Sequence, residues 1–123
     1  VVGTDDADRA LACARAILAD LQAYNAGRAG PAVRLGIGLH YGDVVLGDIG
    51  SDERLEYTVI GDTVNVASRL ERLTRQIGAD LVISDDLCQH LRDPGLADGL
   101  VRGKPAQLRG REEPVAFWSF STA

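Results

Sequence analysis

The strongest constraint on the fold is a change of periodicity within residues 57–73, YTVIGDTVNVASRLERL. Before Gly61 the run is rich in β-branched residues, and apolar and polar side chains alternate, which predicts a strand over 55–60. After Asp62 the apolar residues recur every three or four positions, which predicts a helix over 62–76, closed by Gly78. A strand that turns directly into a helix requires a domain with both a sheet and a helical layer.

The predicted helix carries two separate stripes of side chains. The apolar stripe, expected to be buried, consists of Val66, Leu70, Leu73 and Ile77. The polar stripe consists of Asn65, Arg69, Arg72 and Gln76. Asn65 and Arg69 lie one turn apart and suit a polyphosphate, because a guanidinium keeps its charge and its planar fork matches phosphate oxygens. A solvated helix face is the alternative interpretation of the same spacing.

The remaining chain predicts an α+β domain with a largely antiparallel sheet. Its predicted elements are a long amphipathic helix (4–26), strands (33–39 and 81–83), a short helix (84–91) and a hairpin (107–109 with 115–120). Thr4 or Asp5 is expected to cap the long helix, Asp62 or Thr63 the central one, and Ser84 the short one.

Glycines punctuate one strand in the pattern Gly36-x-Gly38-x-x-x-Gly42. This is not the spacing of a dinucleotide-binding loop, and no helix is expected to follow it. Gly36 and Gly38 fall on the same face of the strand, so we expect another backbone or a ligand to approach closely there.

Composition excludes several classes of protein. The 123 residues form one domain by size, and 13 basic against 18 acidic residues give a net charge of −5. This charge argues against nucleic acid or an anionic membrane as the main partner. The apolar runs are too short to span a membrane, and the first residues do not resemble a secretory signal, so we expect a cytoplasmic protein.

Cysteine and histidine supply no metal-binding pattern. Cys13 and Cys88 lie far apart in helical contexts, which predicts reduced, half-buried thiols. His40 and His90 have no partner at ligand spacing, so we expect structural or surface roles for both.

Three segments resemble the catalytic domain of class III adenylate/guanylate cyclases. The central one, from Leu35 to Leu73, contains GIGLHYGDVVLGDIGSDERLEYTVIGDTVNVASRLERL. The others are DDADRALACARAILADLQAYN before it and LRGREEPVAFWSF near the end. The resemblance implies a ferredoxin-like nucleotide cyclase fold, here incomplete, with helices packed on a mainly antiparallel sheet.

The resemblance also implies a role for each matching residue. Asn65 falls on the asparagine that orients the ribose of the nucleoside triphosphate. Arg69 falls on the arginine that stabilises charge on the α-phosphate in the transition state.

Four further residues fall on nucleotide-binding positions of the family. Val59 and Val64 fall on positions that line the purine, and Arg109 aligns with a lysine that binds the triphosphate. Thr58 falls on the base-selecting position. Its hydroxyl can accept from the adenine amine or donate to the guanine carbonyl, so chemistry alone leaves the base open. In the family, threonine at this position goes with adenylate cyclases, which favours ATP over GTP.

The family's metal-binding aspartates and base-selecting lysine are expected before Val1. Asp43, Asp48 and Asp62 match no metal position, so no metal ligand is assigned in this chain. The two divalent cations of the family, Mg²⁺ or Mn²⁺, would be held elsewhere. We therefore expect residues 1–123 to be the C-terminal portion of a cyclase domain, inactive alone, whose complete form pairs with a second cyclase domain as a homodimer.

The predicted function is part of an adenylate cyclase that converts ATP to 3′,5′-cyclic AMP and pyrophosphate in signal transduction. One alternative is a cyclase-like regulatory or dimerisation module without chemistry. Another is a generic small-ligand binding domain, for which the match of motifs would be accidental.

Overall fold

The computed structural model describes residues 5–43, 53–103 and 115–121, with the backbone alone over 53–61. In chain order the elements are α1 (Asp6–Ala26), β1 (Ile37–Leu39), α2 (Glu53–Ile77), β2 (Leu81–Ser84), α3 (Asp85–Gln89), the 3-10 helix η1 (Pro94–Ala97), β3 (Val101–Arg102) and β4 (Phe117–Phe120). The four strands form one sheet in the order β1-β2-β4-β3. β1 and β2 are parallel, whereas β4 is antiparallel to both β2 and β3. The predicted α+β fold with a mainly antiparallel sheet is confirmed.

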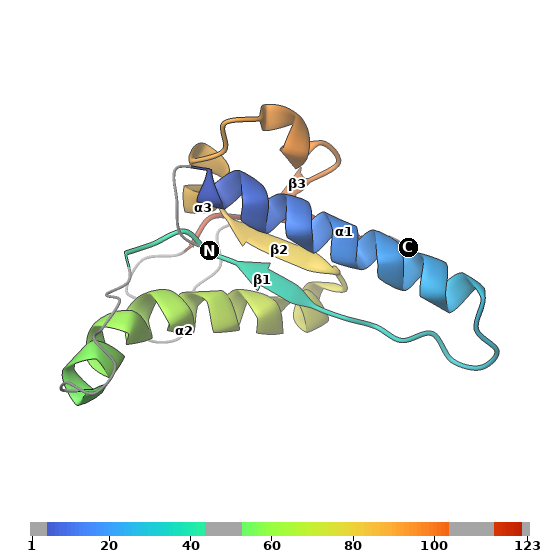
Figure 1. Ribbon diagram of the computed structural model, residues 1–123, viewed down its shortest axis with the longest axis horizontal. Helices are drawn as coiled ribbons and strands as arrows, with labels where there is room; N and C mark the ends of the chain where they lie inside the picture. Colours follow the sequence, from blue (N-terminus) through green and yellow to red (C-terminus); the bar gives the residue numbers. More distant parts are fainter. Residues whose placement is uncertain (1–4, 44–52, 104–114, 122–123) are drawn as a thin grey trace.

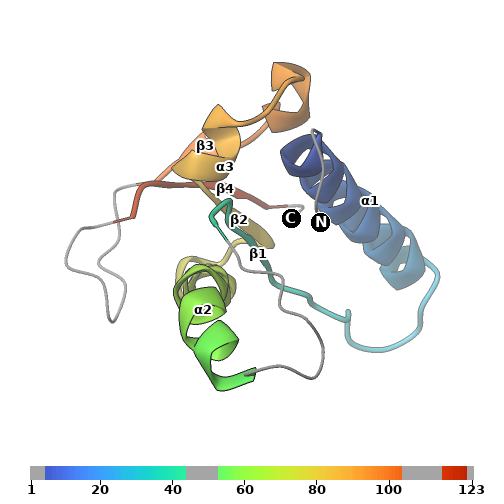
Figure 2. The same ribbon diagram turned by 60° about the vertical axis from the view of Figure 1, so that its left-hand side comes forward.

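Helices cover both faces of the sheet, so the molecule has three layers (Figures 1 and 2). The side chains of β2 alternate between two apolar clusters. Leu81 and Ile83 pack with Leu11 of α1, whereas Val82 packs with Leu70 of α2. Every residue of β2 is buried as a result, which accounts for the apolar run Leu81–Ile83.

α1 begins and ends close to the predicted bounds. Its buried face consists of Ala7, Leu11, Ala14 and Leu18, which recur at helical spacing. Asp5 occupies the N-cap position, as predicted, but its side chain accepts no capping hydrogen bond, and Thr4 lies outside the described residues. Instead, the carboxylate of Asp8 accepts from the backbone amides of Arg92 and Asp93, at 2.8 and 3.1 Å, and ties the first turn to the loop before η1.

β1 is shorter than the predicted strand. Only Ile37–Leu39 pairs, because β2 begins opposite Ile37 and offers no partner further upstream. Val33 and Leu35 are 40% and 43% exposed. The Asn25 side chain holds this approach to the strand by accepting from the Val33 amide at 2.9 Å and donating to its carbonyl at 2.8 Å.

α2 is longer than predicted and replaces the expected strand over 55–60 with helix. A strand needs a neighbour to complete its backbone hydrogen bonds, and no strand of the described sheet pairs with this segment. Residues 44–52, which directly precede α2, lie outside the described residues. Glu53, Arg54 and Leu55 are good helix formers, and a helix satisfies its own backbone groups.

The end of α2 agrees with the prediction except at one residue. Val66, Leu70 and Leu73 are buried, but Ile77 is 44% exposed because it lies in the last turn, beyond the sheet. Gly78 adopts a left-handed φ of 71°, as expected for a glycine that terminates a helix.

The C-terminal part of the sheet is joined to α3 by polar contacts. Ser84 caps α3 as predicted, because its side chain accepts from the Leu87 amide. The indole of Trp118 donates to Asp85 at 3.1 Å, and the Arg102 guanidinium lies over the same indole. Among the described residues β4 pairs with β3, a strand that the sequence did not predict; the predicted partner, 107–109, lies outside them.

Candidate functional site

Three predicted site residues have described side chains, and all three lie on α2 outside its buried apolar stripe. Val66 and Leu70 are 1% and 0% exposed and hold this part of α2 against the sheet. Asn65, about 100° around the helix axis from Val66, is exposed, and Arg69, beside the buried stripe, is partly exposed. Val64 is 50% exposed. The separation of α2 into a buried apolar face and an accessible polar face is therefore as predicted.

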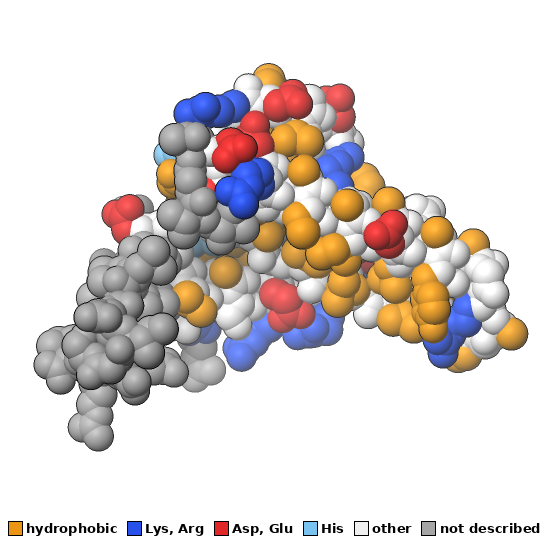
Figure 3. All heavy atoms as spheres, in the orientation of Figure 1, with side chains coloured by type: hydrophobic (Ala, Val, Ile, Leu, Met, Phe, Trp, Pro, Cys, Tyr) orange, Lys and Arg blue, Asp and Glu red, His pale blue; other side chains and the backbone are white. Residues whose placement is uncertain are grey.

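The charges on α2 distinguish Arg69 from Arg75, six residues later. Arg75 is held by Glu71 through two hydrogen bonds of 2.7 and 3.3 Å. Arg69 has no hydrogen-bond or ion-pair partner among the described residues. Its guanidinium is therefore available to an anion, whereas that of Arg75 is already paired. Charged side chains of both signs gather over α2 in Figure 3, while apolar ones gather over α1.

A close approach of β1 to α2 positions this helix. A Cβ atom added to Gly38 would lie 2.6 Å from the carbonyl oxygen of Ala67 and 2.9 Å from the Cα of Glu71. A Cβ on Gly36 would overlap the side chain of Thr74. The close approach expected at these glycines is therefore observed, and the neighbour is α2. Gly38 faces its backbone, and Gly36 faces the side chain of Thr74.

Thr63 lies at the N-terminal end of this row of contacts and meets the chain that follows β1. Its hydroxyl donates to the carbonyl of Asp43 at 2.7 Å. A Cβ on Gly42 would lie 2.8 and 2.9 Å from its Oγ1 and Cγ2 atoms. The prediction that Thr63 or Asp62 caps the helix is wrong, because α2 begins at Glu53 and both residues lie inside it.

Three predicted nucleotide-binding residues have no described side chain. Thr58 and Val59 lie within α2, in the part where the backbone alone is described. Arg109 lies in 104–114, outside the described residues. The structure therefore places Asn65 and Arg69 on one face of α2, with Val64 beside Asn65 on an adjoining face. Their grouping with the other three residues stays a prediction.

Both histidines lie where the parallel strands β1 and β2 end. His40 Nδ1 is 2.9 Å from the hydroxyl of Ser84, which is fully buried. Tyr41 stacks on His90 with a centroid distance of 3.8 Å, and His90 Nδ1 is 2.7 Å from the carbonyl of Asp86. These contacts tie the chain after β1 to α3.

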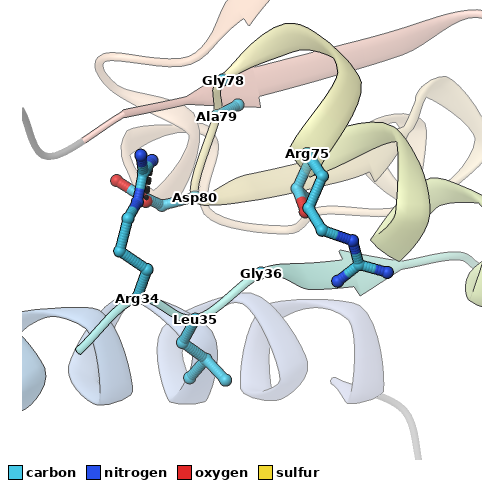
Figure 4. Close-up of a pocket in the computed structure, with 8 residues that line it drawn as sticks. Arg34, Leu35, Gly36, Arg75, Gly78, Ala79 and Asp80 are labelled. Carbon is cyan, nitrogen blue, oxygen red and sulfur yellow. Dashed lines mark hydrogen bonds and ion pairs between the residues drawn. The ribbon is translucent and has the colours of Figure 1, made fainter.

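Two open cavities lie at the opposite end of β1. One, of about 310 Å³, is lined by Arg34, Leu35, Gly36, Thr74, Arg75, Gly78, Ala79 and Asp80 (Figure 4). The other, of about 280 Å³, lies between α1 and residues 32–35. In the first, Arg34 turns toward the largely buried carboxylate of Asp80, at 3.5 Å. Neither cavity includes Asn65 or Arg69, so neither is the site that the sequence predicts.

The described residues do not fit a metal ion. Among them, no three His, Cys, Asp or Glu side chains are grouped closely enough to hold one.

Among the described residues, no helix combines the length and the apolar character that crossing a membrane requires.

One family model matches almost the whole chain. Residues 3–120 match the model of the adenylate and guanylate cyclase catalytic domain. The chain therefore belongs to this family, as its resemblance implied.

The curated relatives of this chain are much longer proteins. It is 36% identical over 100 residues to an adenylate cyclase of Anabaena cylindrica, covering 80% of this chain and 20% of that protein. It is 38% identical over 124 aligned residues to adenylate cyclase 1 of Rhizobium meliloti, covering 96% and 18%. An uncharacterized protein of Mycobacterium tuberculosis is 40% identical over 108 residues, covering 88% and 19%. The chain thus spans about a fifth of the length of these relatives.

Proposed function

We propose that this chain supplies the ribose-binding and α-phosphate-binding half of an adenylate cyclase active site. The observation that carries the proposal is that Asn65 and Arg69 lie one turn apart on the accessible face of α2, in a chain of the cyclase family. No described residue is a hydrogen-bond or ion-pair partner of Arg69. Two relatives that bear the name adenylate cyclase support the choice of reaction.

The proposed reaction forms one bond and breaks one. The 3′-hydroxyl oxygen of ATP attacks the α-phosphorus, the bond from this phosphorus to the pyrophosphate oxygen breaks, and the hydroxyl proton is released to solvent. Negative charge grows on the α-phosphate oxygens during the transfer. The Arg69 guanidinium stabilises that charge, and the Asn65 amide orients the ribose so that its 3′-oxygen is in line for attack.

The base and the triphosphate are assigned to the other predicted residues. Val59 and Val64 line the purine, Thr58 accepts a hydrogen bond from the adenine amine, and Arg109 binds the triphosphate. In this assignment Thr58→Cys loosens the preference for ATP over GTP, measured as the ratio of the two kcat/KM values. An unchanged ratio would remove Thr58 from the base pocket.

A second cyclase domain is the proposed partner, in a homodimer of the complete domain. The family resemblance calls for two divalent cations, Mg²⁺ or Mn²⁺. Since the described residues do not fit a metal ion, no step is assigned to a metal in this chain.

The test compares two arginines of α2 in the complete protein. Arg69→Ala should lower kcat about 10²-fold or more, because a group that binds the transition state is lost, with a smaller effect on KM. Asn65→Ala should act in the same direction. Arg75→Ala is the matched control, because this guanidinium is occupied by Glu71, and it should leave turnover nearly unchanged. Equal activity of Arg69→Ala and the control would refute the proposal.

A regulatory or dimerisation module without chemistry is the second candidate. The two candidates differ in one measurement on the complete protein with Mn²⁺ and ATP. The enzyme produces cyclic AMP in proportion to its concentration, whereas the module produces none at any concentration.

A further inference from the structure

Thr63 contacts the chain that follows β1 through both branches of its side chain. The hydroxyl donates to the Asp43 carbonyl at 2.7 Å, and this hydrogen bond is exposed. The methyl group packs over Gly42, where an added Cβ would lie 2.9 Å from it. Thr63 lies two positions before Asn65 and six before Arg69, and it touches neither cavity.

The contacts between α2 and residues 36–42 follow one side of the helix. The residues of α2 that meet the glycines are Thr63, Ala67, Glu71 and Thr74, at spacings of four, four and three. At 3.6 residues per turn these positions share one face, and Asn65 and Arg69 lie on the far side of the helix from Thr63. A rotation of α2 about its axis that breaks the Thr63 contact therefore moves Asn65 and Arg69 as well.

The anchor of Thr63 is itself held on two sides. The His40 ring meets the buried hydroxyl of Ser84 at the end of β2. The next residue, Tyr41, stacks on His90 beside α3. Asp43 follows two residues later, so its carbonyl is fixed relative to the sheet and not only to α2.

We propose that Thr63 is a positioning residue of the cyclase site. Its hydroxyl bond to Asp43 sets the rotation of α2 that directs Asn65 and Arg69 at the nucleotide. This inference rests on the proposed function, because it assigns to Thr63 an effect that acts through those two side chains.

The test replaces the two branches of Thr63 separately in the complete protein. Thr63→Val keeps the shape and removes the hydroxyl. Its kcat should fall about tenfold, because small misplacements of catalytic groups are costly, with KM changed less than about threefold. Thr63→Ser keeps the hydroxyl and should retain kcat within about twofold. The melting temperatures of both variants should stay within a few degrees of the parent, since the lost bond is exposed.

A double variant separates positioning from a general structural effect. If Thr63 acts through both side chains, Thr63→Val should lower kcat clearly less than tenfold when Arg69→Ala is already present, because only the effect through Asn65 remains. Wild-type kcat in Thr63→Val, or a full tenfold loss repeated in the Arg69→Ala background, would overturn the inference while leaving the proposed function intact. If Arg69→Ala itself keeps wild-type turnover, the proposed function fails, and the inference fails with it.

Discussion

The two long helices are attached to the sheet in different ways. α1 is held by apolar side chains, with Leu11 and Leu18 inserted among residues of the sheet and α3, and it leaves Ile17 and Tyr24 exposed on its other sides. α2 also buries an apolar stripe, but along one side β1 approaches the helix backbone so closely that only a glycine fits at position 38. A side-chain layer separates the sheet from α1, and part of that layer is absent beneath α2.

This difference accounts for which helix carries the candidate site. Interdigitated side chains tolerate small shifts, because rotamers can adjust. A helix whose backbone touches a strand has less freedom to slide or rotate, because neither backbone can move without the other. Catalytic groups must be held within about half an ångström of a productive position, so the second kind of attachment suits the residues of the site.

The largest expected effect on stability is at the α1 side. Leu11 is fully buried, so Leu11→Ala should lower the free energy of unfolding by about 2–5 kcal/mol, measured by urea denaturation. Ile17→Ala, on the exposed side of the same helix, is the control and should cost much less. If the two cost the same, α1 is not held by this insertion. Turnover per folded molecule should not change, because α1 carries no site residue.

A glycine substitution tests the α2 side. Gly38→Ala should cost about 1–3 kcal/mol, because its new methyl meets the backbone of Ala67 and Glu71, which cannot move aside cheaply. Unlike Leu11→Ala, it should also lower kcat in the folded protein, by shifting α2. The control is Gly27→Ala, where an added Cβ meets nothing within 4 Å. Full turnover in stable Gly38→Ala would contradict the role given to the close approach.

A smaller effect is expected at the amide that holds the approach to β1. Asn25→Ala removes two hydrogen bonds to Val33, both at an exposed position, and should cost about 0.5–1.5 kcal/mol by thermal denaturation. Hydrogen exchange of the Val33 amide should accelerate, since it loses its acceptor. Gln22→Ala, an exposed substitution one turn earlier, should change neither measurement.

The smallest effect is a difference between the two thiols. Cys13 is exposed on α1, whereas partial burial, and then the Asp85 carboxylate, raise the pKa of Cys88; Arg102 opposes this shift. Iodoacetamide should therefore modify Cys13 before Cys88, as followed by mass spectrometry of the peptides. Equal rates would contradict the environment assigned to Cys88.

The sign of the pH dependence follows from the same shift. Because the folded pKa of Cys88 lies above the unfolded one, its contribution to stability is present at neutral pH. It is lost as the pH rises through the unfolded and then the folded value. The melting temperature of Cys88→Ser should accordingly fall slightly less between pH 7 and about pH 9.5 than that of the parent.

Local patterns predicted the elements that depend on local chemistry. The helix over 4–26, the buried strand that became β2, the Ser84 cap and the end of α2 at Gly78 were all predicted from neighbouring residues. The errors fall where a distant partner decides. Residues 33–36 do not pair because β2 offers no partner there, and 55–60 are helical because no strand of the described sheet lies beside them.

In the candidate site, too, features set by neighbouring residues were predicted, and a contact between distant residues was missed. The spacing of Asn65 and Arg69 placed them on one accessible face, and a resemblance to the family assigned their roles. The Thr63–Asp43 hydrogen bond joins residues 20 positions apart, which no local pattern reveals. The one hint was Gly42, whose missing side chain leaves room for Thr63.

The chain contains a single tryptophan, Trp118, which donates to Asp85 and lies beneath Arg102. All indole emission therefore reports on one location, where β3, β4 and α3 meet. Fluorescence of the unlabelled protein should distinguish unfolding of this region from changes at α2, on the other face of the sheet. A denaturation curve can thus be followed by this intrinsic chromophore without an added dye, whereas a nucleotide bound at α2 should leave its emission nearly unchanged.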